Sequence, residues 1–135
     1  MILIDAGPLI AIVKADDQHH AACVAALRKI REPLATVWPA LTEAMYLLGD
    51  VSGGQEAVWE MIARGAVHLQ EVGMADLPRI RELMRKYADR SMDLADAALI
   101  RVAEREGIRQ FFTVDRKDFA VYRLHGKIRP ILVPL

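Results

Sequence analysis

MILID, at residues 1–5, is a short apolar run that ends at a single carboxylate, Asp5. The turn residues Gly7 and Pro8 follow at once, so the run predicts a buried strand that ends at an acid. In an open parallel α/β sheet, ligands bind at the carboxyl ends of the strands. We therefore expect Asp5 to lie at a ligand-binding edge, and the other acids that reach this edge to indicate what binds there.

The composition favours one domain that spans residues 1–135, because 53% of the residues are hydrophobic and no linker or repeat interrupts the chain. Cys23 is the only cysteine, which excludes a disulfide framework and a thiolate metal cluster. No apolar run is long enough for a membrane span. These features predict a soluble, cytoplasmic protein that does not contact a membrane.

The charge pattern gives no overall signal for nucleic-acid binding. Eighteen basic residues balance eighteen acidic ones, so any contact with RNA must come from local basic patches. Aromatic residues make up 6% of the chain, which argues against a surface that binds single strands mainly by stacking. We expect Trp38 and Trp59 in the core or in an interface.

Strand and helix patterns alternate along the chain. Strands are expected at 1–4, 34–38, 66–72 and 110–114, with an edge strand at 131–133. Helices are expected from Pro8 to Val13, over 16–31, around 41–48, around 58–62, up to about Arg90 from Leu77, and over 94–103. This alternation predicts an α/β fold, with a central parallel sheet and helices on both faces.

Acidic residues recur where strands end or helices begin. In chain order they are Asp5, Glu43, Asp93, Asp96, Asp115 and Asp118. Each one alone could be a helix cap or a turn residue. Together they are expected to converge on one edge of the sheet, where several carboxylates repel one another.

A divalent cation resolves this repulsion. Carboxylate oxygens without a cluster of cysteine or histidine favour Mg²⁺, or Mn²⁺, over zinc. One or two such ions can position a water against a phosphodiester and stabilise the negative charge that develops. The predicted chemistry is therefore phosphodiester hydrolysis.

Four segments, taken in order, resemble the PIN-domain nucleases, and in particular the VapC-like toxins of toxin–antitoxin pairs. They are Asp5 in MILIDAGPLIAIV, Glu43 in ALTEAMYLL, Asp96 in MDLADAALIRVAE and Asp115 in TVDRKDF. The resemblance spans essentially the whole chain. It implies a three-layer α/β/α sandwich, usually a homodimer, that acts as a Mg²⁺- or Mn²⁺-dependent endoribonuclease and binds a cognate antitoxin.

The resemblance also implies roles for individual residues. Asp5, Glu43, Asp96 and Asp115 would be the catalytic acids, with Asp5, Asp96 and Asp115 as metal ligands. Asp93 is the alternative to Asp96 as the third ligand, and Asp96 is preferred because its distance from Asp115 in the sequence suits the family better. The supporting residues would be Asp93, which is also the expected N-cap, Asp118, and Thr113, whose hydroxyl would orient a carboxylate or a water. The chain departs from the family pattern after Asp5, where many members carry Ser or Thr and this chain has Ala6 and Gly7.

Arg116 and Lys117 directly follow Asp115 and are expected to hold RNA phosphate near the metal. Two alternatives to a toxin stay open: an RNA-processing nuclease of the same fold, and an acidic binding module without turnover. The presence of all four catalytic acids favours a nuclease, whereas the sequence does not identify which RNA is cleaved.

Overall fold

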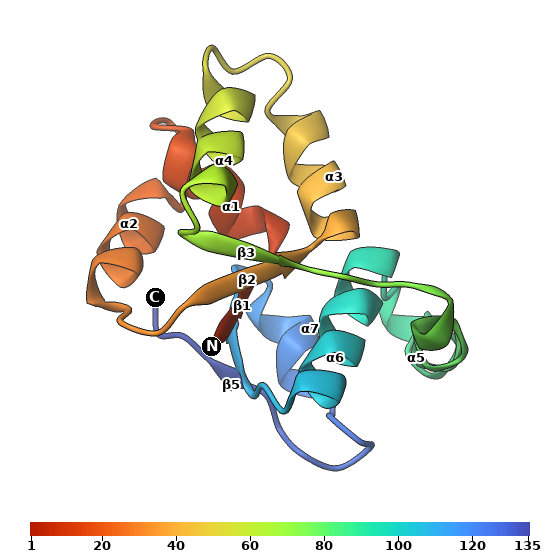
Figure 1. Cartoon of the computed structure of the whole chain (residues 1–135). Coiled ribbons are helices and arrows are strands. Elements are labelled where there is room, and N and C mark those ends of the chain that lie inside the picture. The colour runs from red at the N-terminus through yellow and green to blue at the C-terminus, as the bar shows by residue number, and fades with distance from the viewer.

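The computed structural model describes residues 1–135 and contains one five-stranded sheet with helices on both faces (Figure 1). The strand order is β3-β2-β1-β4-β5, and every neighbouring pair is parallel. The strands are β1 (Ile2–Ile4), β2 (Leu34–Val37), β3 (Val67–Gln70), β4 (Gln110–Phe112) and β5 (Ile131–Leu132). The predicted α/β/α sandwich with a central parallel sheet is confirmed.

The first strand is the centre of the sheet, because β1 pairs with β2 on one side and with β4 on the other. All three of its residues are buried. Side chains alternate between the faces of a strand, so Ile2 and Ile4 join one core cluster and Leu3 joins the other. A strand that is covered on both faces needs a continuous apolar run, which explains the sequence of the first four residues.

Seven α-helices surround the sheet. They are α1 (Ala6–Val13), α2 (His20–Lys29), α3 (Trp38–Leu47), α4 (Gly54–Ala63), α5 (Leu77–Lys86), α6 (Leu94–Glu106) and α7 (Arg116–Val121). One face is covered by α1, α2 and α4, and the other by α6 and α7, with α5 packed on α6. Helix α3 contacts both α1 and α6, so it links the two layers at the edge where the strands end. No helix combines the length and the apolar character needed to cross a bilayer.

Several predicted boundaries were wrong. Helix α2 begins at His20 and not at Asp16, because the Asp17 carboxylate accepts a hydrogen bond from the His19 N–H and holds the preceding residues in a turn. The predicted helix up to Arg90 ends at Lys86, and a separate 3₁₀ turn, Ala88–Arg90, follows. Helix α6 continues to Glu106, where Gly107 ends it with a positive φ of 69°.

Candidate active site

The predicted acids lie at the carboxyl edge of the sheet. Asp5 follows β1 and caps α1, and Asp115 follows β4 and caps α7. Asp93 caps α6, and its carboxylate accepts a hydrogen bond of 2.8 Å from the Asp96 N–H in the first turn. Glu43 projects from α3, and it lines one groove together with Asp93. The parallel topology therefore brings together acids that are up to 110 positions apart in the sequence.

Thr113 joins the two acids that follow the central strands. Its hydroxyl donates to the Asp5 carboxylate over 3.2 Å and accepts a hydrogen bond of 3.0 Å from the Asp115 N–H. The other carboxylate oxygen of Asp5 accepts from the Ala6 N–H over 2.8 Å. Asp5 is only 9% exposed, and these two donors fix its orientation. The Thr113 side chain therefore bridges the Asp5 carboxylate and the backbone of Asp115.

Burial and mutual repulsion raise the pKa values in the cluster. Burial raises the pKa of Asp5 to about 6, and the charges of Glu43 and Asp93 add to the rise. Burial, followed by the charges of Asp5 and Asp93, raises the pKa of Asp96 to about 8. Burial also raises the pKa values of Glu43 and Asp115 above their usual range. The acids therefore lie close enough to one another to make full ionisation unfavourable.

Tyr122 supports Asp96 and was missed in the sequence. Its hydroxyl donates a hydrogen bond of 2.8 Å to the Asp96 carboxylate, and the fully buried ring packs against Phe119 and Tyr87. Asp96 lies 26 residues before Tyr122, so no local pattern connects them. A buried tyrosine shortly after a predicted acid was the only available signal.

Two other buried carboxylates of this chain show what a purely structural acid looks like here. Asp76 receives hydrogen bonds from the Gly73 N–H, Arg101 and Arg105, and these lower its pKa. Glu104 pairs with Arg79 through two hydrogen bonds of 2.8 Å. In contrast, the acids of the cluster have no basic partner: no salt bridge involves Asp5, Glu43, Asp93, Asp96 or Asp115.

The donor set fits a hard divalent cation. It consists of carboxylate oxygens without cysteine or histidine, which is the ligand type that Mg²⁺ and Mn²⁺ prefer. No three of the His, Cys, Asp and Glu side chains are arranged to ligate one ion together. Mg²⁺ commonly binds through one or two carboxylates and keeps several waters. The open arrangement therefore suits an ion that stays largely hydrated.

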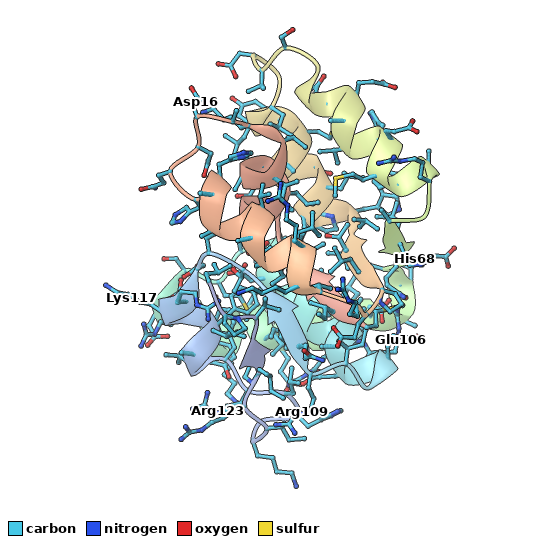
Figure 2. The ribbon with its side chains drawn as sticks, turned by 90° about the vertical axis from the view of Figure 1, so that its left-hand side faces the viewer. Asp16, His68, Glu106, Arg109, Lys117 and Arg123 are labelled. Atoms are coloured by element: carbon cyan, nitrogen blue, oxygen red, sulfur yellow. The ribbon has the colours of Figure 1, made fainter.

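The side chains that follow Asp115 differ in whether they already make contacts within the protein. Arg116 donates to the carbonyl oxygens of Thr113 and Val133, so one of its nitrogens is already engaged by the backbone. Lys117 is exposed and extends away from the ribbon into solvent (Figure 2). Asp118 lies 3.7 Å from Arg90 and donates its backbone N–H to the Asp115 carboxylate. Lys117 is therefore the freer of the two predicted RNA-binding cations.

The two tryptophans are not in the core. Trp38 is 51% exposed and Trp59 is 44% exposed. Trp38 is the first residue of α3, where the chain turns out of the sheet, and Trp59 lies on the outer side of α4 next to the α3–α4 loop. Of the two expected placements, the core or an interface, the exposure excludes the core. The inner positions of α3 and α4 are filled by smaller side chains such as Ala40 and Val58.

The fold and the site define a class: a parallel α/β protein with an unpaired acidic centre at the carboxyl edge of its sheet. The profile of the PIN domain matches residues 2–124. The chain therefore belongs to the PIN-domain family, and the family predicted from the sequence is confirmed.

Particular relatives resemble the chain over most or all of its length. Ribonuclease VapC26 of Mycobacterium tuberculosis is 29% identical over 135 residues, which is 98% of this chain and all of the relative. The crystal structure of M. tuberculosis VapC20, described as a sarcin-ricin loop cleaving toxin, has a TM-score of 0.75 at 18% identity, covering 82% of this chain and 87% of that one. A toxin–antitoxin complex from Klebsiella pneumoniae has a TM-score of 0.65 at 19% identity, covering 98% and 100%. Within the PIN-domain family, the chain is thus similar in sequence to a VapC ribonuclease and in fold to a VapC toxin.

Proposed function

We propose that this chain is an endoribonuclease that hydrolyses RNA phosphodiester bonds at the acidic cluster and acts as the toxin of a toxin–antitoxin pair. The observation that carries the proposal is the group of five carboxylates without a basic partner, in a PIN-domain fold. The full-length similarity to a VapC ribonuclease supports RNA as the substrate.

The proposed cofactor is Mg²⁺, with Mn²⁺ as the alternative, and Asp5, Asp96 and Asp115 are the proposed ligands. Because no three acids are arranged to ligate one ion directly, some of these carboxylates would hold the ion through its bound waters. The bound ion would neutralise the cluster, supply a nucleophilic water and stabilise the charge that develops on the phosphate. The hydrogen bonds from Thr113 and Tyr122 support this assignment, because each fixes one of the proposed ligands before an ion arrives.

The remaining acids have distinct proposed roles. Glu43 lies at the exposed rim of the cluster, and its raised pKa suits a group that takes a proton from the attacking water. Asp93 and Asp118 support the cluster by capping and through water. Arg116 and Lys117 hold the RNA phosphate, with Lys117 as the main contact because Arg116 also binds backbone carbonyls.

The proposed partners are an antitoxin and a second copy of the chain, and the proposed unit is one nuclease domain over residues 1–135. The similarity to the solved toxin–antitoxin complex from K. pneumoniae supports an antitoxin as a partner. An antitoxin arginine inserted among the carboxylates would form charge-assisted hydrogen bonds there and take the place of the cation.

The test is RNA cleavage by the purified protein with Mg²⁺, with Mn²⁺ and with chelator, using structured and unstructured RNA. Asp5→Asn should abolish cleavage, because Asn keeps the size of Asp5 and removes its charge. Asp16→Asn is the matched control, since Asp16 is exposed in the turn between α1 and α2 and lies well away from Lys117 (Figure 2). Folded, metal-loaded protein that leaves every RNA intact would favour a binding module without turnover.

A further inference from the structure

Trp38 is an exposed aromatic residue beside the acidic cluster. It begins α3 directly after β2, so it lies at the same carboxyl edge of the sheet as the acids. Half of its surface is exposed, although it is one of the largest apolar side chains in the chain. No aromatic or cationic side chain of this protein covers its ring.

Trp38 forms a wall shared by two grooves. The first has a volume of about 410 Å³ and joins Trp38 to Glu43 and Asp93 of the acidic cluster, with the half-exposed Leu94 also in its lining. The second, of about 630 Å³, runs from Trp38 along the end of β3 to Met74 and Arg105. An RNA strand that runs from the acidic cluster through both grooves would therefore pass the indole ring of Trp38.

We propose that Trp38 is a stacking platform for a nucleobase of single-stranded RNA, one that lies next to the phosphate held at the acidic cluster. This inference rests on the proposed ribonuclease function. Stacking on an aromatic ring suits any base, because every base has a flat π face. An uncharged base can bury the apolar walls formed by Trp38 and Leu94, while its phosphates stay near the proposed cation at the acidic cluster.

The lining of the groove favours RNA over a second copy of the chain. A protein partner that covered the groove would also bury Glu43 and Asp93, which no basic side chain of this chain pairs with, and buried unpaired charges are costly. A base needs to cover only the apolar part. One stacking position agrees with the low aromatic content, because the main binding energy comes from the phosphates and the cation.

Trp59 provides a matched internal control. It is also exposed and lies on a helix, but its groove is formed by the α3–α4 loop and contains no residue of the acidic cluster. The chain has only these two tryptophans. Trp59→Phe therefore leaves Trp38 as the sole indole fluorophore, and Trp38→Phe leaves Trp59.

The experiment uses both variants in an Asp5→Asn background, which prevents cleavage, with Mg²⁺ and an unstructured RNA of about ten nucleotides. We expect the RNA to quench the fluorescence of Trp38 and to leave that of Trp59 nearly unchanged. The same oligomer without bases should not quench Trp38. Trp38→Ala should weaken RNA binding roughly 5- to 100-fold, whereas Trp38→Phe should keep most of the affinity and Trp59→Ala all of it.

Three results would overturn the proposal. If wild-type protein cleaves RNA but Trp38→Ala binds it with unchanged affinity, the stacking site is refuted and the nuclease function stands. If Trp38→Ala lowers the molar mass measured by light scattering and leaves RNA affinity unchanged, Trp38 belongs to a contact between copies. If wild-type protein neither binds nor cleaves RNA, the proposed function fails, and the stacking site fails with it. Circular dichroism of each variant verifies that it is folded.

Discussion

Replacing Asp96 by Asn is expected to stabilise the metal-free protein in alkaline solution. Asp96 is 8% exposed, and burial together with the charges of Asp5 and Asp93 raises its pKa to about 8. In an unfolded chain, an aspartate titrates near pH 4. The folded state thus favours the protonated form, so this contribution to stability is complete at acid pH and is lost as the pH rises through about 8.

The size of the effect follows from the change in pKa. A rise from 3.8 to about 8, at 1.36 kcal/mol for each tenfold change in proton affinity, sets an upper limit of roughly 6 kcal/mol. Water entry and small relaxations reduce such penalties, so we expect a gain of about 2–3 kcal/mol above pH 8. For a domain of this length, that corresponds to an increase of about 7–10 °C in Tm. Asn keeps the shape of Asp96 and can still accept the hydrogen bond from Tyr122.

The assay is thermal unfolding with chelator at about pH 5 and about pH 8.5. The Tm values of wild type and Asp96→Asn should differ little at the lower pH, and Asp96→Asn should have the clearly higher Tm at the higher pH. Mg²⁺ should narrow this difference in Tm, because it stabilises only the wild-type protein, whose site is intact. Asp76→Asn is the matched control, because hydrogen bonds from the Gly73 N–H, Arg101 and Arg105 lower the pKa of Asp76. The change in stability should have the opposite sign: Asp76→Asn should be less stable than the wild-type protein at neutral pH. A constant difference between Asp96→Asn and wild type at both pH values would refute the reasoning.

Three further substitutions test the surroundings of the site. Tyr122→Phe should keep the fold and weaken Mn²⁺ binding about tenfold in calorimetry, because it removes the hydrogen bond that fixes Asp96; an unchanged affinity would contradict the positioning role. Thr113→Val should lower the free energy of unfolding in urea by about 1–3 kcal/mol, because it leaves the Asp115 N–H unpaired, and should also reduce RNA cleavage. Gly7→Ala should destabilise the protein by about 1–3 kcal/mol, since its Cβ would lie 2.5 Å from Val114 Cγ2, and a second change, Val114→Ala, should restore most of the loss.

The parts of the fold that follow from the sequence are those with a strong local pattern. The buried run before Asp5 and the periodic helix around Leu41 and Leu48 were predicted because their apolar spacing directly reflects what covers them. Helix α7 was missed, since six residues with a single buried side chain, Phe119, are too few to show a period. The start of α2 was misplaced because Asp17 stabilises the turn before the helix and not the helix itself.

For the site, the sequence predicted which acids reach the edge of the sheet. Asp5 and Asp115 could be placed because each ends a strand, and the capping role of Asp93 followed from its position before an apolar helix. Their contacts could not be predicted, because they depend on a strand order that puts β1 between β2 and β4. The bond from Tyr122 to Asp96 is a product of that packing and has no sequence pattern of its own.

The central position of β1 also determines when the acidic cluster can form during synthesis. The strand that Asp5 follows is synthesised well before its partner β4 and before Asp115, the acid that follows β4. At ordinary rates of translation, about 5–20 s separate the synthesis of Asp5 from that of Asp115. During this interval the growing chain holds Asp5 without Thr113 and Asp115, so the acidic cluster cannot form until Asp115 has been made.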